Sequence, residues 1–158
     1  INESLELLGI KGPAWLTDPR FALLSGALVD VWKGLGLATV IYIAGINAIP
    51  REYYEASEID GANSIQQFLN ITLPLARPAT FTVIILSLIG GLRSFDLIWS
   101  MTRGGPGFTT DVISSVIYKQ YQAGFYGLST AGNVVLVVLV AIIIVPLSAF
   151  LSKREIEL

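Results

Sequence analysis

The longest apolar stretch of the chain constrains its fold more than any other feature, because it holds no charged residue from Tyr121 to Ser152. Crossing the hydrocarbon core of a bilayer takes about 20 apolar residues at the rise of an α-helix. Residues 129–151 meet that requirement, and the basic pair Lys153-Arg154 follows directly. The stretch therefore predicts a membrane-spanning helix and places the chain among integral membrane proteins.

The composition agrees with this class. Hydrophobic residues make up 53% of the chain and charged residues 14%, with a mean hydropathy of +0.67. Soluble domains carry about 25% charged residues. The length of 158 residues permits one domain, so we expect a single all-α bundle of spanning helices.

Two further apolar stretches predict spanning helices at residues 21–49 and 77–99. The first has only Asp30 and Lys33 as charges, and these lie three residues apart, so that they can pair on a helix. Its Ala22-x-x-x-Gly26 segment offers a small-residue face for close contact with another helix.

The second stretch carries Arg93 and Asp96 near its far end, three residues apart and able to neutralise each other. Charge at membrane depth is costly, and an intramembrane carboxylate is a candidate functional group. For Arg93 we prefer an interfacial pair, whereas two interpretations of Asp96 stay open: one half of that pair, or a group that lines a solute path. Asn133 is the second candidate for the path, although an amide at that depth more often bonds to a neighbouring helix.

A polar block from Pro50 to Pro74 lies between the first two apolar stretches. Pro50 suits a first helical turn, where its missing N–H costs nothing, and Gly61 can take the left-handed conformation that closes a helix. Ser64 and Gln67 have the spacing of a capping box, which predicts a second helix that runs until Pro74 stops it. The block therefore predicts a helix that ends near Asp60, a glycine turn and a second helix.

The residues Glu55-Ala56-Ser57, Gly61 and, after nine intervening residues, Ile71-x-Leu73-Pro74 resemble the EAA loop of ABC importer permeases. The spacing matches, and the one departure is Ser57 in place of a second alanine, a small-for-small change. The segments Ile49-Pro50, Tyr54-Glu55-Ala56 and Ile59-Asp60-Gly61-Ala62 are similar to the sugar-uptake branch of that family. The later Phe95-Asp96 and Met101-Thr102-x-Gly104-Gly105-Pro106 extend the resemblance over most of the chain.

The resemblance implies a type I ABC importer permease-like bundle whose loop at residues 50–76 lies in the cytoplasm and docks into a cleft on an ATP-binding cassette ATPase subunit. The further partners that it implies are a second permease subunit, identical or not, an extracytoplasmic solute-binding protein and membrane lipid. The residues that we expect at the ATPase-docking loop are Glu55, Ala56, Ser57, Asp60, Gly61, Ala62, Ile71, Leu73 and Pro74.

The sequence lacks the residues of most enzyme mechanisms. It has no Cys and no His, which removes disulfides, thiolate nucleophiles, the usual zinc sites and histidine acid–base chemistry. No lysine follows a glycine, so the ending of a phosphate-binding P-loop is absent. If ATP drives this protein, a partner must bind it. A net charge of −2 and a pI near 5.0 leave no basic patch for nucleic acid. We therefore expect no catalytic residue, no metal and no cofactor.

The expected order is an external segment at 1–20, spanning helices at 21–49, 77–99 and 129–151, the cytoplasmic loop at 50–76, an external segment at 100–128 and a cytoplasmic tail at 152–158. The glycine-rich start of the 100–128 segment predicts a rigid turn, which the resemblance places opposite the solute-binding protein. This orientation follows from the resemblance, because four basic residues fall on each side. Since the chain begins with Ile1 and family permeases have more spans, we expect an N-terminal part to be missing.

The resemblance thus implies a permease of the bacterial cytoplasmic membrane that carries a sugar or a sugar-like solute such as glycerol phosphate. ATP hydrolysis on the separate subunit would drive alternating access through the loop. Two alternatives are a channel or assembly scaffold without an ATPase, and a membrane aspartyl hydrolase that uses Asp30 and Asp96. The sequence does not name the solute.

Overall fold

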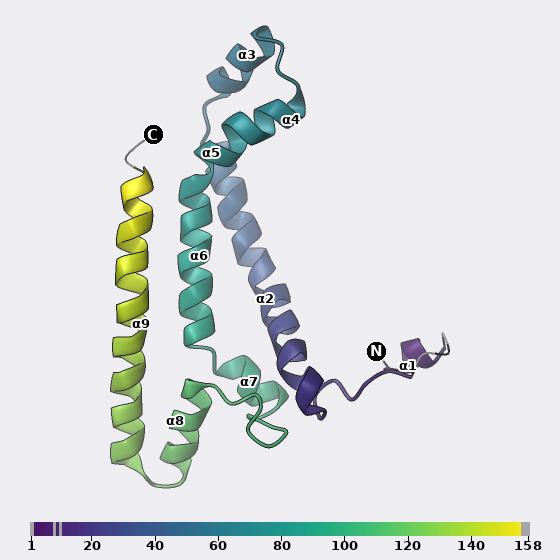
Figure 1. Ribbon diagram of the computed structural model, residues 1–158, viewed down its shortest axis with the longest axis vertical. Coiled ribbons are helices and arrows are strands. Elements are labelled where there is room, and N and C mark those ends of the chain that lie inside the picture. Colours follow the sequence, from purple (N-terminus) through teal and green to yellow (C-terminus); the bar gives the residue numbers. More distant parts are fainter. Residues whose placement is uncertain (1, 8, 10, 156–158) are drawn as a thin grey trace. The chain divides into compact units, whose positions relative to one another are not determined.

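The computed structural model describes residues 2–7, 9 and 11–155, and the regular secondary structure of this part is all helices and no strands, as predicted. The elements in chain order are α1 (Asn2–Glu6), α2 (Pro19–Asn47), α3 (Arg51–Ile59), α4 (Ser64–Gln67), the π-helix η1 (Phe68–Thr72), α5 (Leu73–Leu75), α6 (Arg77–Leu92), α7 (Asp96–Met101), α8 (Ile113–Gln122) and α9 (Tyr126–Glu155) (Figure 1).

Two described helices are long and apolar enough to cross a membrane, namely α2 and the segment Tyr126–Lys153 of α9. A third span exists only if Ser64–Leu75 and Arg77–Leu92, which are bent by 59° at their junction, are counted as one broken span. The large apolar side chains of α2 and α9 are mostly exposed, which suits helices whose surroundings are lipid or other spanning helices. Pro146 lies inside α9 without ending it.

The helix predicted at 77–99 is not continuous, because α6 ends at Leu92 and the chain restarts as α7 at Asp96. The pair Gly90-Gly91 precedes the break, and glycine is about 1 kcal/mol less favourable than alanine inside a helix. With 16 residues, α6 is about 24 Å long, shorter than the roughly 30 Å of a hydrocarbon core.

The predicted charge pairs are also absent. Among the described residues the one ion pair joins Asp111 to Lys119, so neither Asp30 with Lys33 nor Arg93 with Asp96 is paired. The break after α6 explains the second case, because the spacing argument required one continuous helix through both residues.

The chain forms two compact units, residues 1–33 with 92–140 and residues 34–91 with 141–158. In the first unit the predicted small-residue face is used: Ala22 and Gly26 are buried, and a Cβ on Gly26 would lie 3.6 Å from Ile98 of α7. In the same unit a Cβ on Gly132 of α9 would lie 2.8 Å from Ile117 of α8. Small residues therefore allow these helices to pack closely.

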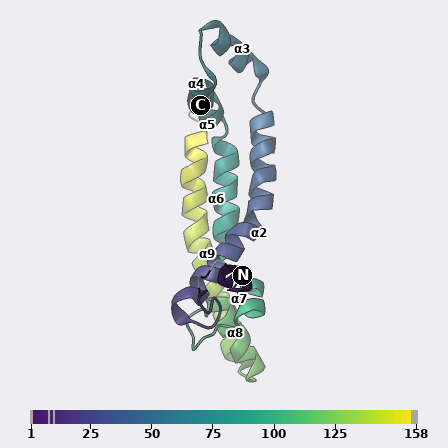
Figure 2. The same cartoon turned by 90° about the vertical axis from the view of Figure 1, so that its right-hand side faces the viewer.

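In the first unit α7 and α8 lie side by side (Figures 1 and 2), and a row of aromatic rings holds them together. Phe95 stacks on Trp99 with ring centroids 5.6 Å apart, and Trp99 meets Tyr118 edge-on at 4.7 Å. Tyr118 continues the row to Tyr121 at 6.5 Å, and Tyr121 to Tyr126 at 5.3 Å. Aromatic pairs at these distances contribute about 0.5–1.5 kcal/mol each beyond their burial, so the row fixes the direction of α7 after the break.

In the second unit the end of α2 comes close to the start of α6 at Gly45. A Cβ built on Gly45 would lie 2.5 Å from the Cβ of Ala79, which is itself buried. This contact lies next to the polar block, whose elements α3, α4, η1 and α5 belong to the same unit.

Candidate functional site

The polar block forms a helical hairpin whose two arms are α3 and the continuous segment from α4 to α5 (Figure 1). At the tip, Gly61 has a φ of 78°, as its predicted role in closing the first helix requires. The N–H of Ala62 donates to Ser57 O at 2.9 Å and the N–H of Gly61 donates to Glu58 O at 3.0 Å. These two bonds form a Schellman motif, so α3 ends at Ile59 with its last carbonyls satisfied.

The second arm is capped by Asn63, and the predicted cap at Ser64 is wrong by one residue. Asn63 Oδ1 accepts from the N–H groups of Ile65 at 3.1 Å and Gln66 at 3.0 Å. Gln66 Oε1 accepts from the N–H of Asn63 at 2.9 Å, which completes a capping box. The sequence allows two capping boxes one residue apart, Asn63 with Gln66 and Ser64 with Gln67. Asn63 is the cap because its backbone is extended, whereas Ser64 is already helical.

The second arm does not stop at Pro74. It passes through the π-helix η1 and continues to Leu75, and the bend of 59° follows at Ala76. Pro74 is the second residue of α5 and lies within this continuous arm, shortly after the π-helix η1. Pro50 is likewise displaced from its expected place, since it is the N-cap of α3 and helical geometry begins at Arg51.

Two side-chain contacts join the arms. The hydroxyls of Tyr54 and Thr72 lie 2.9 Å apart, and Gln67 Nε2 donates to Ser57 Oγ at 3.0 Å. Ser57 is therefore more than a small residue, because its hydroxyl makes a contact that alanine cannot make. The sequence signal for this contact was a serine at the position where the motif usually has an alanine.

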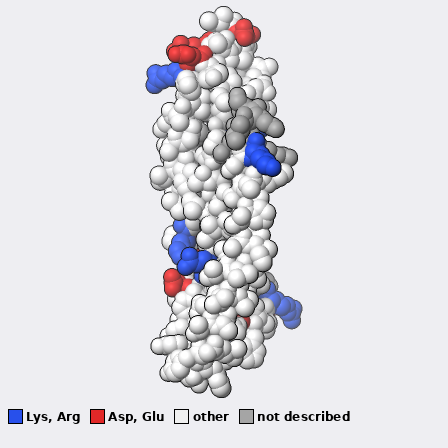
Figure 3. Space-filling view, turned by 90° about the vertical axis from the view of Figure 1, so that its left-hand side faces the viewer, with Lys and Arg blue, Asp and Glu red and all other residues white. Residues whose placement is uncertain are grey.

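The exposed surface of the hairpin carries acidic side chains together with exposed isoleucines beside the tip. Of the predicted docking residues, Glu55, Ala56, Asp60, Gly61 and Leu73 are exposed, and Ser57, Ala62, Ile71 and Pro74 are half-buried. Exposed Glu52 and Glu58 add to the acidic side chains that gather on this loop in Figure 3. Ile59 and Ile65, on either side of the tip, are 88% and 71% exposed. Sequence reasoning did not select these isoleucines, since their exposure depends on the turn between them.

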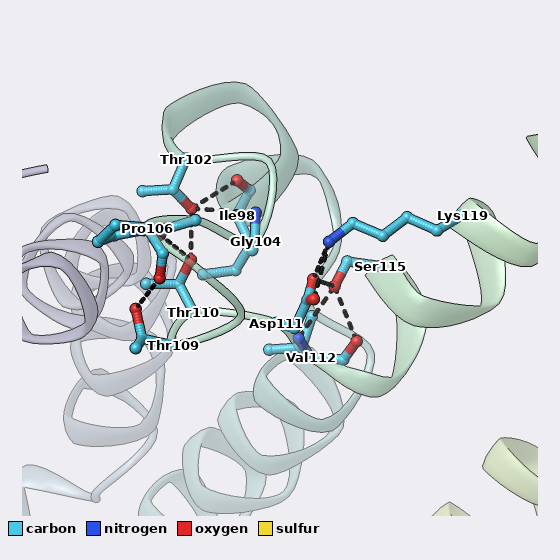
Figure 4. Close-up of polar contacts among 11 residues, drawn as sticks. Ile98, Thr102, Gly104, Pro106, Thr109, Thr110, Asp111, Val112, Ser115 and Lys119 are labelled. Carbon is cyan, nitrogen blue, oxygen red and sulfur yellow. Dashed lines mark hydrogen bonds and ion pairs between the residues drawn. The ribbon is translucent and has the colours of Figure 1, made fainter. Parts of the chain in front are cut away.

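The segment between α7 and α8 is a tightly bonded turn (Figure 4). Thr102 and Thr110 join their hydroxyls at 2.7 Å, and Thr110 also donates to Gly105 O at 2.7 Å. Lys119 Nζ contacts the Asp111 carboxylate at 2.8 and 2.7 Å, and Ser115 Oγ donates to the same carboxylate at 2.8 Å. The expected turn is present at residues 102–112, whereas the helix α8 that follows it was not predicted.

Neither candidate residue for the solute path, Asp96 or Asn133, belongs to a cluster of polar side chains. Asp96 is the exposed first residue of α7. Asn133 is exposed on α9 and donates to Ser129 O of its own helix at 3.2 Å, so the expected bond to a neighbouring helix is not the one it makes. No bond in the described part joins Asp30 to Asp96, and that part contains no cluster of three metal-ligating side chains.

A family model for the binding-protein-dependent transport system inner membrane component matches residues 5–155. The trehalose/maltose transport system permease protein of Thermococcus litoralis is 40% identical over 139 residues, which cover 88% of this chain and 47% of that protein. A crystal structure of a bacterial ABC transporter involved in the import of the acidic polysaccharide alginate superposes with a TM-score of 0.86 at 27% identity, over 96% of this chain and 54% of that one.

A second crystal structure, of a bacterial alginate ABC transporter in complex with an alginate pentasaccharide-bound periplasmic protein, gives a TM-score of 0.82 at 28% identity. It covers 92% of this chain and 51% of that one. The chain thus spans about half the length of these relatives.

Proposed function

The chain belongs to the family of binding-protein-dependent transport system inner membrane components, as its loop sequence predicted, and from this premise we propose a specific role for it. We propose that it translocates a sugar or sugar-like solute across the bacterial cytoplasmic membrane as a multi-pass permease subunit, coupled to ATP hydrolysis on a separate subunit. The family is one of transport permeases and not a class of enzymes. The carbohydrates in the names of the relatives, trehalose, maltose and alginate, support the class of solute.

The observation that carries this proposal is the hairpin at residues 50–76. Its arms are closed by a Schellman motif and a capping box and are joined by two side-chain contacts, so that it can move as one body. It leads directly into α6 through the bend at Ala76. The hairpin also follows α2, which is long enough to span a membrane. A rigid element joined to such a helix suits alternating access, because motion of a docked partner then tilts the helix.

The surface chemistry of the hairpin describes the partner that it fits. Residues 51–60 hold four carboxylates and one guanidinium, with an exposed isoleucine at position 59. A cleft with an apolar floor and basic rim on an ATPase subunit matches this surface. The other proposed partners are a second permease subunit against the exposed faces of the spanning helices and a solute-binding protein opposite residues 100–128. ATP is bound by the partner subunit, and the chain itself holds no cofactor.

The test uses Gly61→Val in the assembled importer. A Cβ at a left-handed position costs about 1 kcal/mol or more, and a β-branched residue suits it worse, so the arms are misdirected while the apolar helices still insert. We expect a membrane-inserted chain with poor ATPase co-purification or poor uptake, and a smaller loss in Glu55→Ala.

Gly124→Val is the matched control. Gly124 has a φ of 84° and closes α8 with the same kind of turn, and no atom stands within 4 Å of its Cβ position, as for Gly61. It therefore imposes the same backbone strain outside the hairpin. The readout for this control is ATPase co-purification, which should stay normal, because Gly124 lies in the segment proposed to face the solute-binding protein and not the ATPase. Normal ATPase binding and uptake in Gly61→Val would show that the hairpin is only a connector, and flux through vesicles that lack the ATPase would favour a channel.

A further inference from the structure

Ser57 lies at the centre of the contacts between the two arms of the hairpin. Its hydroxyl donates to Tyr54 O at 2.7 Å, one turn earlier in α3, and accepts from Gln67 Nε2 at 3.0 Å across the hairpin. Gln67 also reaches Tyr54 O, at 3.5 Å. Both Ser57 and Gln67 are half-buried, whereas their neighbours Ala56 and Gln66 are exposed. The pair therefore faces the inside of the hairpin.

The second contact, Tyr54 with Thr72, lies farther from the tip. The residues pair in antiparallel order, Ser57 with Gln67 and then Tyr54 with Thr72. On α3 the two partners are three residues apart, nearly one turn of an α-helix, and so share a face. On the second arm the two partners are five residues apart, which in an α-helix would place them about 140° from each other.

The π-helix η1 resolves this mismatch. It spans Phe68–Thr72, and the N–H of Leu73 donates to Phe68 O, a bond across five residues. An i to i+5 repeat brings residues five apart close to one face, so Gln67 and Thr72 both reach α3. The π turn and the two contacts thus depend on one another: the extra residue aligns the partners, and the partners hold the turn.

We propose that Ser57 and Gln67, aligned with Tyr54 and Thr72 by the π turn, form a polar clamp that fixes the angle between the two arms and thereby sets the efficiency of coupling. Ser57 is a positioning residue in this proposal, because it acts through Gln67 and not on the solute or on ATP. An alanine at this position, which the motif usually has, would leave the Gln67 amide with only its 3.5 Å contact. This inference rests on the proposed function of the hairpin.

The test compares Ser57→Ala, Tyr54→Phe and the double variant with the parent chain. Each single change removes one hydroxyl and keeps the shape of the side chain. Ser148→Ala is the matched control, because Ser148 Oγ donates to Val145 O at 3.0 Å, the same bond within a helix that Ser57 makes to Tyr54, and has no bond across to another element.

The first measurement is the angle itself. Since the chain has no native Cys, spin labels at Glu52→Cys on α3 and Asn70→Cys on η1, both exposed, give a distance distribution in the assembled importer. We expect a narrow distribution in the parent and in Ser148→Ala, a broader one in each single variant and the broadest in the double variant. An unchanged distribution in Ser57→Ala would overturn the clamp.

The second measurement is the number of ATP molecules hydrolysed per solute taken up in proteoliposomes, with whichever of maltose, trehalose and an alginate oligosaccharide the parent transports best. Loss of one such hydrogen bond corresponds to about a two- to tenfold change in an equilibrium, so we expect this ratio to rise about two- to tenfold in Ser57→Ala. The solute concentration that gives half-maximal uptake should stay unchanged, because the clamp does not contact the solute.

The two proposals fail in different ways. If Gly61→Val uncouples transport while Ser57→Ala broadens the distances without changing the ratio, the clamp has no coupling role and the hairpin remains the coupling element. If neither Gly61→Val nor Ser57→Ala affects uptake, the hairpin is not the coupling element, and both proposals are wrong.

Discussion

The close approach of α2 to α6 gives the sharpest stability prediction, because one glycine makes the contact and another on the same helix does not. A Cβ on Gly45 would lie 2.5 Å from the Cβ and 3.8 Å from the Cα of Ala79, which belongs to the start of α6 and has little freedom to move. Gly36 has no atom within 4 Å of its Cβ position. Gly45→Ala and Gly36→Ala therefore make the same chemical change in two different surroundings.

The magnitude follows from two opposing terms. Replacing glycine by alanine inside a helix stabilises it by about 0.5–1 kcal/mol, and both variants receive this gain. Gly45→Ala must also separate α2 from α6 by the width of a methyl group, and overpacking of this kind costs about 1–3 kcal/mol. The free energy of unfolding should therefore be about 1–3 kcal/mol lower in Gly45→Ala than in Gly36→Ala.

The assay is thermal denaturation of the detergent-solubilised importer, followed by the fraction of monodisperse protein after size-exclusion chromatography. At about 2–4 °C per kcal/mol for a chain of this size, Gly45→Ala should melt several degrees below Gly36→Ala. Gly36→Ala should melt at or slightly above the parent. Equal melting temperatures in the two variants would refute the close contact between α2 and α6.

Three further predictions concern the rest of the chain. Asp96→Asn should alter solute uptake while the ATPase still co-purifies, because Asp96 is exposed at the break after α6 and has no ion-pair partner in the described residues; unaltered uptake kinetics would remove it from the path. Single cysteines at residues 52–73 should react with cytoplasmic reagents and those at 103–112 only with external ones, and labelling of both from one side would contradict the topology. Lys119→Met should destabilise the turn at 102–112 by about 1.5–3 kcal/mol through the loss of a partly buried charged hydrogen bond, visible as faster proteolysis there, whereas exposed Lys33→Met should not.

Local features of the sequence were sufficient for several parts of this structure. The absence of charge from Tyr121 to Ser152 determined a long helix, because so long an apolar stretch is unstable in water and stable as a helix in a bilayer. Gly61 determined the turn of the hairpin, because few other residues adopt a φ of 78° without strain. The motif around Glu55 indicated the family, which the match of a family model to residues 5–155 shows.

The tertiary structure decided the features that depend on a second element. The choice of Asn63 over Ser64 as the cap was decided by the backbone that leaves the glycine turn, and both residues satisfy the local rule equally. The end of α6 at Leu92 was decided with the packing of Phe95 and Trp99 against α8, which no periodicity within the stretch reveals. The π turn is the clearest case. An α-helix satisfies the same local preferences, and the extra residue of the π turn is stabilised only by the contacts of Gln67 and Thr72 with α3 across the hairpin.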